Sequence, residues 1–342
     1  MKRRHCVLAA IAWLYPTVLL GLAVAFRCVG EQWWVTGVGL YLPRLILAAP
    51  LPVIAIALAA PRLRRFFWTQ IAALVLLVFP LMGFVLPWPT LRSRGAPVLR
   101  VLSYNINSGN GGVDAIVEEI DRQAPDVVFL QEVGSSEPLN GLLRARFQTV
   151  NEANQFVVAS KYPVLSTGDP EKLDYEGRHR SPRFVRQVLD TPLGRIVFYN
   201  VHPLSPREIF YTLRGRGLRR EVLSGRLFSS ANSAVFQANS GLRTLQVEAF
   251  SAAADGETEP VVIAGDTNLP GLSFVLHRYL SRYQDGFTKA GWGLGYTFPT
   301  DRHPWMRIDR IFASEDLRFV RFEVGQSHAS DHRCVVADLQ RR

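Results

Sequence analysis

Residues 261–268 read VVIAGDTN, an apolar run that ends abruptly in polar residues. A short, continuous apolar run bounded by turn residues is typical of a strand buried on both faces. Asp266 and Asn268, which end the run, carry the oxygen atoms that metal ions and phosphate-binding sites use. A single acidic residue at a strand end is more often a turn residue than a metal ligand. The stretch therefore indicates a functional site only if other strands end in the same way.

Three other predicted strands end in the same way. Their polar endings are Asn105-Ile106-Asn107, Gln131-Glu132 and Asn200-Val201-His202. Strands that lie side by side would gather these endings at one edge of a sheet, where a rigid backbone holds a site in shape. Two later clusters, Arg307-Ile308-Asp309 and Ser330-Asp331-His332, complete the set.

The intervening segments indicate a mixed α/β domain over residues 98–342. Val113, Ile116, Val117 and Ile120 follow helical spacing, and residues 242–254 form a second predicted helix. Of the three cysteines only Cys334 lies in this part, so we expect neither an internal disulfide nor a cysteine zinc site there.

In this order, the six polar clusters resemble the endonuclease/exonuclease/phosphatase superfamily, the DNase I-like enzymes. The resemblance covers about residues 98–342 and extends to Arg243 and Gln246, which fit the Arg-x-x-Gln of that family. It implies a four-layer α/β sandwich, in which two packed mixed sheets are flanked by helices and the site lies at their shared edge.

The resemblance also implies roles for the polar residues. Asn105, Glu132 and Asp331 are expected to bind the metal, with Asp331 alternatively pairing with a histidine. The expected catalytic residues are His202, Asp266, Asn268, Asp309 and His332. Asn107, Asn200 and Arg243 are expected to contact phosphate or substrate. A hard divalent cation, Mg²⁺ or Mn²⁺, would offset the negative charge of a phosphate ester.

Residues 1–90 form a separate, apolar segment. Its three runs, about 6–26, 36–60 and 66–88, are each long enough for a transmembrane helix. The first could instead be a cleaved signal peptide, but it is long, lacks a small-x-small site and is followed by two further runs. We therefore expect three transmembrane helices, followed by a short tether at residues 91–97.

Basic residues predict the orientation of this segment. Lys2, Arg3 and Arg4 precede the first run, and Arg62, Arg64 and Arg65 separate the second from the third. Both groups belong on the cytoplasmic side. The prediction is a multi-pass protein of the cell's inner membrane, with a cytoplasmic N-terminus and an extracytoplasmic catalytic domain close to the bilayer.

The net charge of +10 also suggests anionic partners such as phosphate esters, lipid headgroups or nucleic acid. Six arginines and only two acidic residues lie in a predicted insertion at 203–240, where they alternate with apolar residues. Either this insertion is a solvated loop, or it is a basic amphipathic flap that contacts anionic lipid and frames the site.

Three functions remain open from the sequence. The first is a phosphoesterase acting on a phosphate or pyrophosphate near the outer membrane face. The layout is similar to a membrane-anchored bacterial branch of the family that is associated with glycopeptide (vancomycin/teicoplanin) resistance. This resemblance implies an isoprenoid-lipid pyrophosphate as the substrate. The second is an extracytoplasmic nuclease acting on DNA or RNA. The third is a non-catalytic, membrane-bound binding module, against which the complete residue set argues. No protein partner is predicted.

Overall fold

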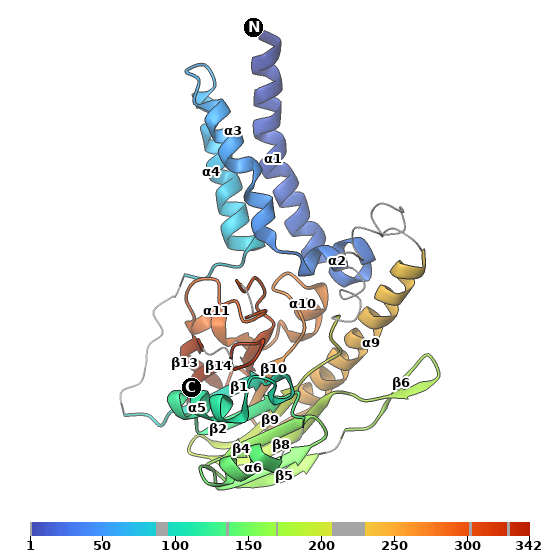
Figure 1. Cartoon of the computed structure of the whole chain (residues 1–342), viewed down its shortest axis with the longest axis vertical. Helices are drawn as coiled ribbons and strands as arrows, with labels where there is room; N and C mark the ends of the chain where they lie inside the picture. Colours follow the sequence, from blue (N-terminus) through green and yellow to red (C-terminus); the bar gives the residue numbers. More distant parts are fainter. Residues whose placement is uncertain are drawn as a thin grey trace.

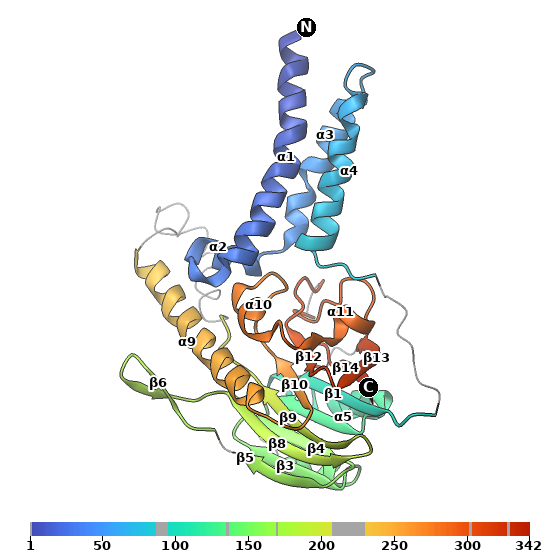
Figure 2. The ribbon, with the colours of Figure 1, turned by 180° about the vertical axis from the view of Figure 1, so that it is seen from behind.

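The computed structural model describes residues 2–86, 95–134, 137–168, 170–206, 230–300, 303–326 and 329–342. Helices from the N-terminal quarter of the chain project from an α/β body, and the N-terminus lies at the far end of this projection (Figure 1). The view from behind shows the same division (Figure 2).

The first sheet of the body has six strands in the order β13-β14-β1-β2-β4-β3. These are β1 (Leu99–Asn105), β2 (Val127–Gln131), β3 (Thr149–Ala153), β4 (Phe156–Ser160), β13 (Leu317–Val324) and β14 (Val335–Arg341). β1 and β2 are parallel, whereas the other neighbours are antiparallel, so the sheet is mixed.

The second sheet is also mixed, with six strands in the order β11-β12-β10-β9-β8-β5. These are β5 (Val164–Gly168), β8 (Phe184–Thr191), β9 (Gly194–Val201), β10 (Val261–Asp266), β11 (Gln284–Asp285) and β12 (Asp309–Ala313). Only β9 and β10 run parallel in it. A separate hairpin pairs β6 (Leu173–Tyr175) with β7 (Arg178–Arg180).

The two sheets pack face to face through apolar side chains, with the Phe129 and Phe198 rings 5.3 Å apart. Neighbouring residues of one strand point to opposite faces. Thus Phe129 enters this inter-sheet core, while Val128 packs in the cluster that includes residues of α5 (Val113–Gln123) and α6 (Glu137–Arg144). Burial on both faces is why β2 and β10 are apolar up to their polar last residues, Gln131 and Asp266.

Helices cover the outer face of the second sheet as well. α9 (Ser230–Asp255) and α10 (Phe274–Leu280) pack against β9 and β10 through Phe250 and Val275, among others. α11 (Gly286–Ala290) adds Phe287 to the inter-sheet core. The predicted four-layer sandwich is therefore confirmed.

The N-terminal segment is less regular than the sequence predicts. Its helical elements are α1 (Lys2–Cys28), η1 (Gly30–Gln32), α2 (Trp34–Tyr41), η2 (Arg44–Ala48), α3 (Pro50–Leu58), η3 (Arg64–Phe66), α4 (Phe67–Leu76) and η4 (Leu77–Leu81). Two stretches, His5–Cys28 and Arg64–Leu81, are long and apolar enough to cross a membrane. A third span exists only if the pair Trp34–Tyr41 and Arg44–Leu58 counts as one, although the two halves meet at 93°.

The bend has a local cause. Leu42 is extended, with ψ 148°, and the next residue is Pro43. The ring of a proline disfavours a helical conformation in the residue before it. The predicted run 36–60 is therefore broken after Tyr41, so that α2 turns away from α3.

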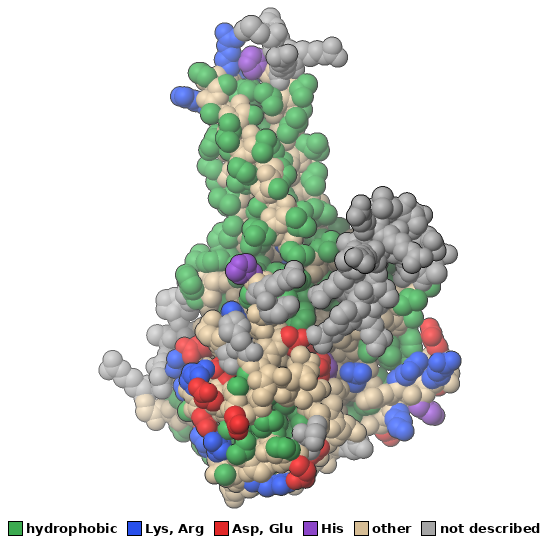
Figure 3. Space-filling model, in the orientation of Figure 1, with side chains coloured by type: hydrophobic (Ala, Val, Ile, Leu, Met, Phe, Trp, Pro, Cys, Tyr) green, Lys and Arg blue, Asp and Glu red, His purple; other side chains and the backbone are tan. Residues whose placement is uncertain are grey.

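Apolar side chains cover the outside of the helical projection. Those of Ile56 and Val53 are 76% and 67% exposed, and many others on α1, α3 and α4 are also exposed. The space-filling view shows this green surface, with basic side chains at its far end (Figure 3). Exposed apolar surface of this extent is unusual in a protein surrounded by water.

Two predicted segments fall largely or partly outside the described residues. Of the tether at 91–97 only 95–97 are described, and of the insertion at 203–240 the residues 207–229 are not. The end of the predicted insertion belongs to a helix, because α9 begins at Ser230 and not near residue 242.

The projection packs directly on the body. Tyr41 of α2 and Leu81 of η4 share an apolar cluster with Met306 and Ile308, which precede β12. Trp305 Nε1 also donates a hydrogen bond to the backbone oxygen of Tyr41 (3.1 Å). The N-terminal segment and the loops next to β12 therefore form one structural unit.

Candidate active site

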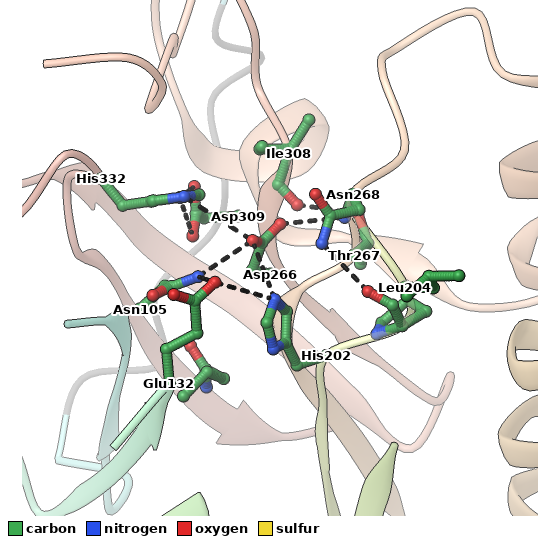
Figure 4. A network of polar contacts seen from close by, with 12 residues as sticks. Asn105, Glu132, His202, Leu204, Asp266, Thr267, Asn268, Ile308, Asp309 and His332 are labelled. Carbon is green, nitrogen blue, oxygen red and sulfur yellow. Dashed lines mark hydrogen bonds and ion pairs between the residues drawn. The ribbon is translucent and has the colours of Figure 1, made fainter. Parts of the chain in front are cut away.

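The polar strand endings meet at one edge of the sandwich, as the sequence predicts (Figure 4). Asp266 at the end of β10 lies opposite Asp309 at the start of β12 in the antiparallel register. In the other sheet, Asn105 pairs with Gln131, so Glu132 follows directly beside it. The two sheets thus bring four sequence-distant carboxylate and amide groups together.

Asn105 links the two sheets. Its Nδ2 donates to Glu132 Oε1 and to Asp266 Oδ2, both over 3.1 Å. Its Oδ1 accepts from the backbone nitrogen of Asn107 (3.1 Å). The side chain is completely buried, so its amide is held in one orientation between the two carboxylates.

Glu132 and Asn268 both have a positive φ of 51°, which non-glycine residues seldom adopt. Strained backbone of this kind persists where the surrounding structure holds it, often at functional sites. Gly265 meets a different constraint: a Cβ there would lie 1.9 Å from the backbone oxygen of Val201. The Gly-Asp-x-Asn stretch therefore needs its glycine so that β10 can lie close to β9.

His202 faces two carboxylates. Its Nε2 lies 3.3 Å from Glu132 Oε1 and 3.6 Å from Asp266 Oδ2. Its Nδ1 pairs with Gln155 Oε1 (2.8 Å), and an amide oxygen can only accept, so Nδ1 carries the proton. Burial, followed by the charges of Arg183 and His332, lowers the pKa of His202 to about 3.

Asp266 is the central acid of the site. Its Oδ1 accepts from the backbone nitrogen of Asn268 (2.9 Å), whose side chain donates to the oxygen of Pro203 (3.0 Å). Burial raises the pKa of Asp266 to about 7, with Asp309 acting in the same direction and His332 opposing it. A carboxyl group with a pKa near neutrality can take up a proton from water and release it again.

His332 has the opposite character to His202. Its Nδ1 lies 3.0 Å from Asp309 Oδ2 and 3.1 Å from Oδ1, and its Nε2 is 3.7 Å from Asp266 Oδ2. Burial lowers its pKa, but Asp309 and Asp266 outweigh this and raise the pKa of His332 to about 10. The imidazole is therefore positively charged at neutral pH and can donate a proton.

Asp331 does not join this cluster. The sequence left open whether Asp331 binds metal or holds a histidine, and the structure makes Asp309 the partner of the His332 ring. Two groups of side chains could hold a metal ion among the described residues, and neither includes Asp331. The charge of Asp331 contributes to the raised pKa of His332, and its expected metal role stays a prediction.

Two of the three expected substrate contacts, Asn200 and Arg243, make buried hydrogen bonds within the protein, and their predicted contact with substrate stays a prediction. Asn200 is buried and engages Gln131 Nε2 (2.7 Å) and the oxygen of Leu130 (3.1 Å) through the two ends of its amide. Arg243 is completely buried and donates to the backbone oxygen of Leu204, close after His202. Asn107 begins the turn η5 (Asn107–Gly109) after β1.

Two supporting residues have no role that the sequence predicts. Gln155 fixes the tautomer of His202 from the turn between β3 and β4. Ser330 donates to the oxygen of Asn105 (2.7 Å) and accepts from the nitrogen of His332 (3.2 Å), which ties the two site segments together. Ser330 stood in a recognised cluster without an assigned role, whereas nothing near Gln155 distinguished it.

The donor set fits a divalent cation. The ligand atoms of Glu132, His202 and Asp266 all lie within 4.8 Å of one another, as do those of Asp266, Asp309 and His332. His202 Nε2 is buried and has no hydrogen-bond partner among the described residues, and its lone pair faces Glu132 and Asp266. Carboxylate oxygens dominate the first group, which suits Mg²⁺ or Mn²⁺. In the second group His332 is held as a cation by Asp309, so its ring is not available as a ligand.

Comparison with known proteins agrees with this geometry. The profile of the Endonuclease/Exonuclease/phosphatase family matches residues 102–332. A comparison with curated proteins gave no match. Among solved structures, an endonuclease/exonuclease/phosphatase family protein from Bacteroides thetaiotaomicron is 15% identical, covering 72% of this chain and 99% of that one, with a TM-score of 0.50.

Two further solved structures are similar. A functionally unknown conserved protein from Enterococcus faecalis V583 is 14% identical, covering 71% of this chain and 100% of that one, with a TM-score of 0.51. The endonuclease/exonuclease/phosphatase from Beutenbergia cavernae is 21% identical, covering 71% and 72%, with a TM-score of 0.48. At these identities the Bacteroides thetaiotaomicron and Enterococcus faecalis structures speak for the fold alone.

Proposed function

The chain belongs to the endonuclease/exonuclease/phosphatase family and is a hydrolase of phosphoester bonds, and from that premise we propose that it cleaves a phosphate ester or pyrophosphate at the outer face of a membrane. The family generally depends on a divalent metal, here Mg²⁺ or Mn²⁺, which Glu132, Asp266 and His202 would hold. Bound there, the metal would offset the negative charge of the phosphate.

The remaining chemistry follows from the side chains. Asp266 lies 3.7 Å from His332 Nε2 and orients the attacking water, whose proton the bound metal would make easier to lose to solvent. His332 is held as a cation by Asp309 and donates a proton to the leaving oxygen. Asn105 holds Glu132 and Asp266 in place with both of its amide hydrogens, whereas Asn268 uses one amide hydrogen on Pro203 and can offer the other to a phosphate oxygen.

Membrane placement is supported by the surface of the helical projection. Its exposed apolar side chains suit a hydrocarbon environment. The connection between α3 and α4, which contains Arg62, Arg64 and Arg65, lies at the same end of the helical projection as the N-terminus, away from the body (Figure 1). The positive-inside rule assigns that end to the cytoplasm and the body to the opposite side of the inner membrane.

One observation carries the choice of a membrane-proximal substrate. Tyr41, at the body-facing end of α2, donates a hydrogen bond to the backbone oxygen of Asn268 (2.9 Å). The active-site loop is thus in direct contact with the segment that we place in the bilayer. A lipid-linked phosphate or pyrophosphate of the cell envelope, as in the glycopeptide-resistance branch, is the substrate class that this arrangement favours.

The test uses the full chain in liposomes that contain a polyprenyl pyrophosphate. We expect release of inorganic phosphate with Mg²⁺ or Mn²⁺, and none with EDTA or with the Glu132→Gln variant. Plasmid DNA is offered in parallel. Cleavage of DNA without phosphate release from the lipid would contradict the proposal and favour a nuclease.

A further inference from the structure

A cavity of about 70 Å³ lies where the helical projection meets the body. Leu40, Arg44 and Met82 line it from the N-terminal segment, and Trp305 and Arg307 line it from the body. A cavity needs a volume of about 10–15 Å³ to hold one water molecule, so this cavity is large enough for a phosphate group. It is separate from the catalytic cluster, although Arg307 lies two residues before Asp309.

Arg307 is short of partners. Its Nε and Nη1 are buried and have no hydrogen-bond acceptor among the described residues. The guanidinium lies 4.4 Å from the centre of the Phe287 ring, which offers a cation–π contact. A guanidinium stays charged in proteins, and buried donors without an acceptor cost free energy.

The nearby acid does not supply those acceptors. Asp285 Oδ2 accepts from Arg310 Nη1 (2.5 Å), and Asp285 Oδ1 accepts from the backbone nitrogens of Phe287 and Thr288. Asp285 therefore offsets part of the charge of Arg307 from a distance while its oxygens are taken by other donors.

Arg44 brings a second positive charge from the opposite wall. Its guanidinium donates to the backbone oxygens of Leu81 and Leu40, which are neutral groups. No acidic residue lines the cavity among the residues that the structure describes. Within this described part, two guanidinium groups thus share a small space with no acidic side chain in its walls.

We propose that this cavity binds one phosphate group, carried by a lipid headgroup or free in solution. Arginine suits this ligand because its planar group donates two parallel hydrogen bonds to phosphate oxygens. The bound group would accept from both Arg44 and Arg307 and so join the N-terminal segment to the loop before Asp309. The lipid source rests on the membrane placement proposed above, whereas the anion site itself does not.

The test measures binding with the full chain in detergent and EDTA, so that catalysis plays no part. The probes are dioctanoyl phosphatidylglycerol, dioctanoylglycerol without phosphate, and inorganic phosphate, followed by native mass spectrometry and by the shift of the melting temperature. We expect one saturable equivalent of phosphatidylglycerol and none of dioctanoylglycerol. Arg44→Gln and Arg307→Gln should each weaken binding about tenfold or more.

Matched variants separate this site from other sources of binding. Arg27→Gln removes a junction arginine that pairs with His277 and does not line the cavity, so it should bind as the unchanged chain does. Glu132→Gln should also bind normally. If a glutamine variant does not fold, Arg44→Lys or Arg307→Lys replaces it and should bind more weakly than the unchanged chain.

Saturable binding of inorganic phosphate with the same dependence on both arginines would also support the site and identify free phosphate as its source. If neither phosphatidylglycerol nor inorganic phosphate binds saturably, the proposal is overturned. Equal weakening by Arg27→Gln, or undiminished binding by the Arg44 and Arg307 variants, would overturn it as well.

Discussion

The hydroxyl of Tyr41, in the N-terminal segment, donates to the backbone oxygen of Asn268 in the active-site loop over 2.9 Å. The Tyr41 ring also lies 5.7 Å from the guanidinium of Arg243, which in turn donates to the backbone oxygen of Leu204 in the loop after His202. Tyr41 thus contacts the Asn268 loop directly and, through Arg243, supports the loop after His202, although it is more than 200 positions from Asn268 in the sequence. The helical segment is therefore part of the scaffold of the site as well as its anchor.

The first prediction concerns this contact. Tyr41→Phe removes one buried hydrogen bond, worth roughly 0.5–1.5 kcal/mol, and should lower kcat several-fold by loosening the Asn268 loop. Steady-state kinetics on a soluble phosphate ester would measure it. Tyr15→Phe is the matched control, because its hydroxyl donates to the oxygen of Leu47 within the helical segment. Equal kinetic effects of the two variants would speak against a specific link to the site.

The second prediction separates two neighbouring acids. Asp309→Asn removes the charge that holds His332 as a cation, and kcat should fall about 10²-fold or more, the scale of acid–base catalysis. Asp331→Asn leaves that pair intact and should change kcat only a few-fold. The kinetic comparison is made at saturating metal. A larger loss in Asp331→Asn than in Asp309→Asn would reverse the assignment.

The third prediction concerns the pH dependence of stability without metal. Asp266 and His332 have pKa values of about 7 and about 10, raised from ordinary values of 3.8 and 6.5. A group whose pKa is raised in the folded protein stabilises it fully when the pH is below the pKa of that group in the unfolded chain. This stabilisation is lost as the pH rises through the pKa of the group in the folded protein. In EDTA the melting temperature should therefore decline between about pH 4 and pH 10 through these two groups.

Asp309→Asn provides the control for this titration. It removes the main influence that raises the pKa of His332, so the decline between about pH 6.5 and 10 should become shallower. Scanning fluorimetry in detergent measures both profiles. A melting temperature that rises over the alkaline range in the unchanged chain, or an identical slope in the variant, would contradict this account.

The fourth prediction concerns Arg243. This side chain is completely buried and donates to the oxygen of Leu204 and to Asn239 Oδ1. Arg243→Ala should lower the free energy of unfolding by roughly 2–5 kcal/mol, because it leaves a cavity and two unsatisfied acceptors. Arg282→Ala, which breaks an exposed pair with Asp255, should cost less than about 1 kcal/mol. Denaturant titrations of the two variants test the difference.

Much of this architecture could be predicted because strand patterns and polar strand ends are local features. VVIAGDTN and VVFLQE each show a buried strand and its terminal ligands within eight residues. The break after Tyr41 was also visible, since Pro43 follows Leu42, but a hydropathy run averages over it. A proline inside an apolar run therefore needs separate attention when spans are counted.

Other features depend on register and packing, which no local pattern contains. Asp309 and Asp331 are equally placed in the sequence to hold a histidine, and only the sheet register selects Asp309. Gln155 and Tyr41 reach the site through long-range contacts from segments without polar signatures. The residues that contact and position the catalytic side chains could thus be found only from the three-dimensional structure.

The central claim is that Glu132, His202 and Asp266 hold one catalytic divalent cation between the two sheets. Anomalous diffraction from crystals of the full chain grown with Mn²⁺ tests it most directly. A peak is expected within about 2–2.6 Å of Glu132 and Asp266 oxygens. A peak elsewhere with this cluster empty would contradict it.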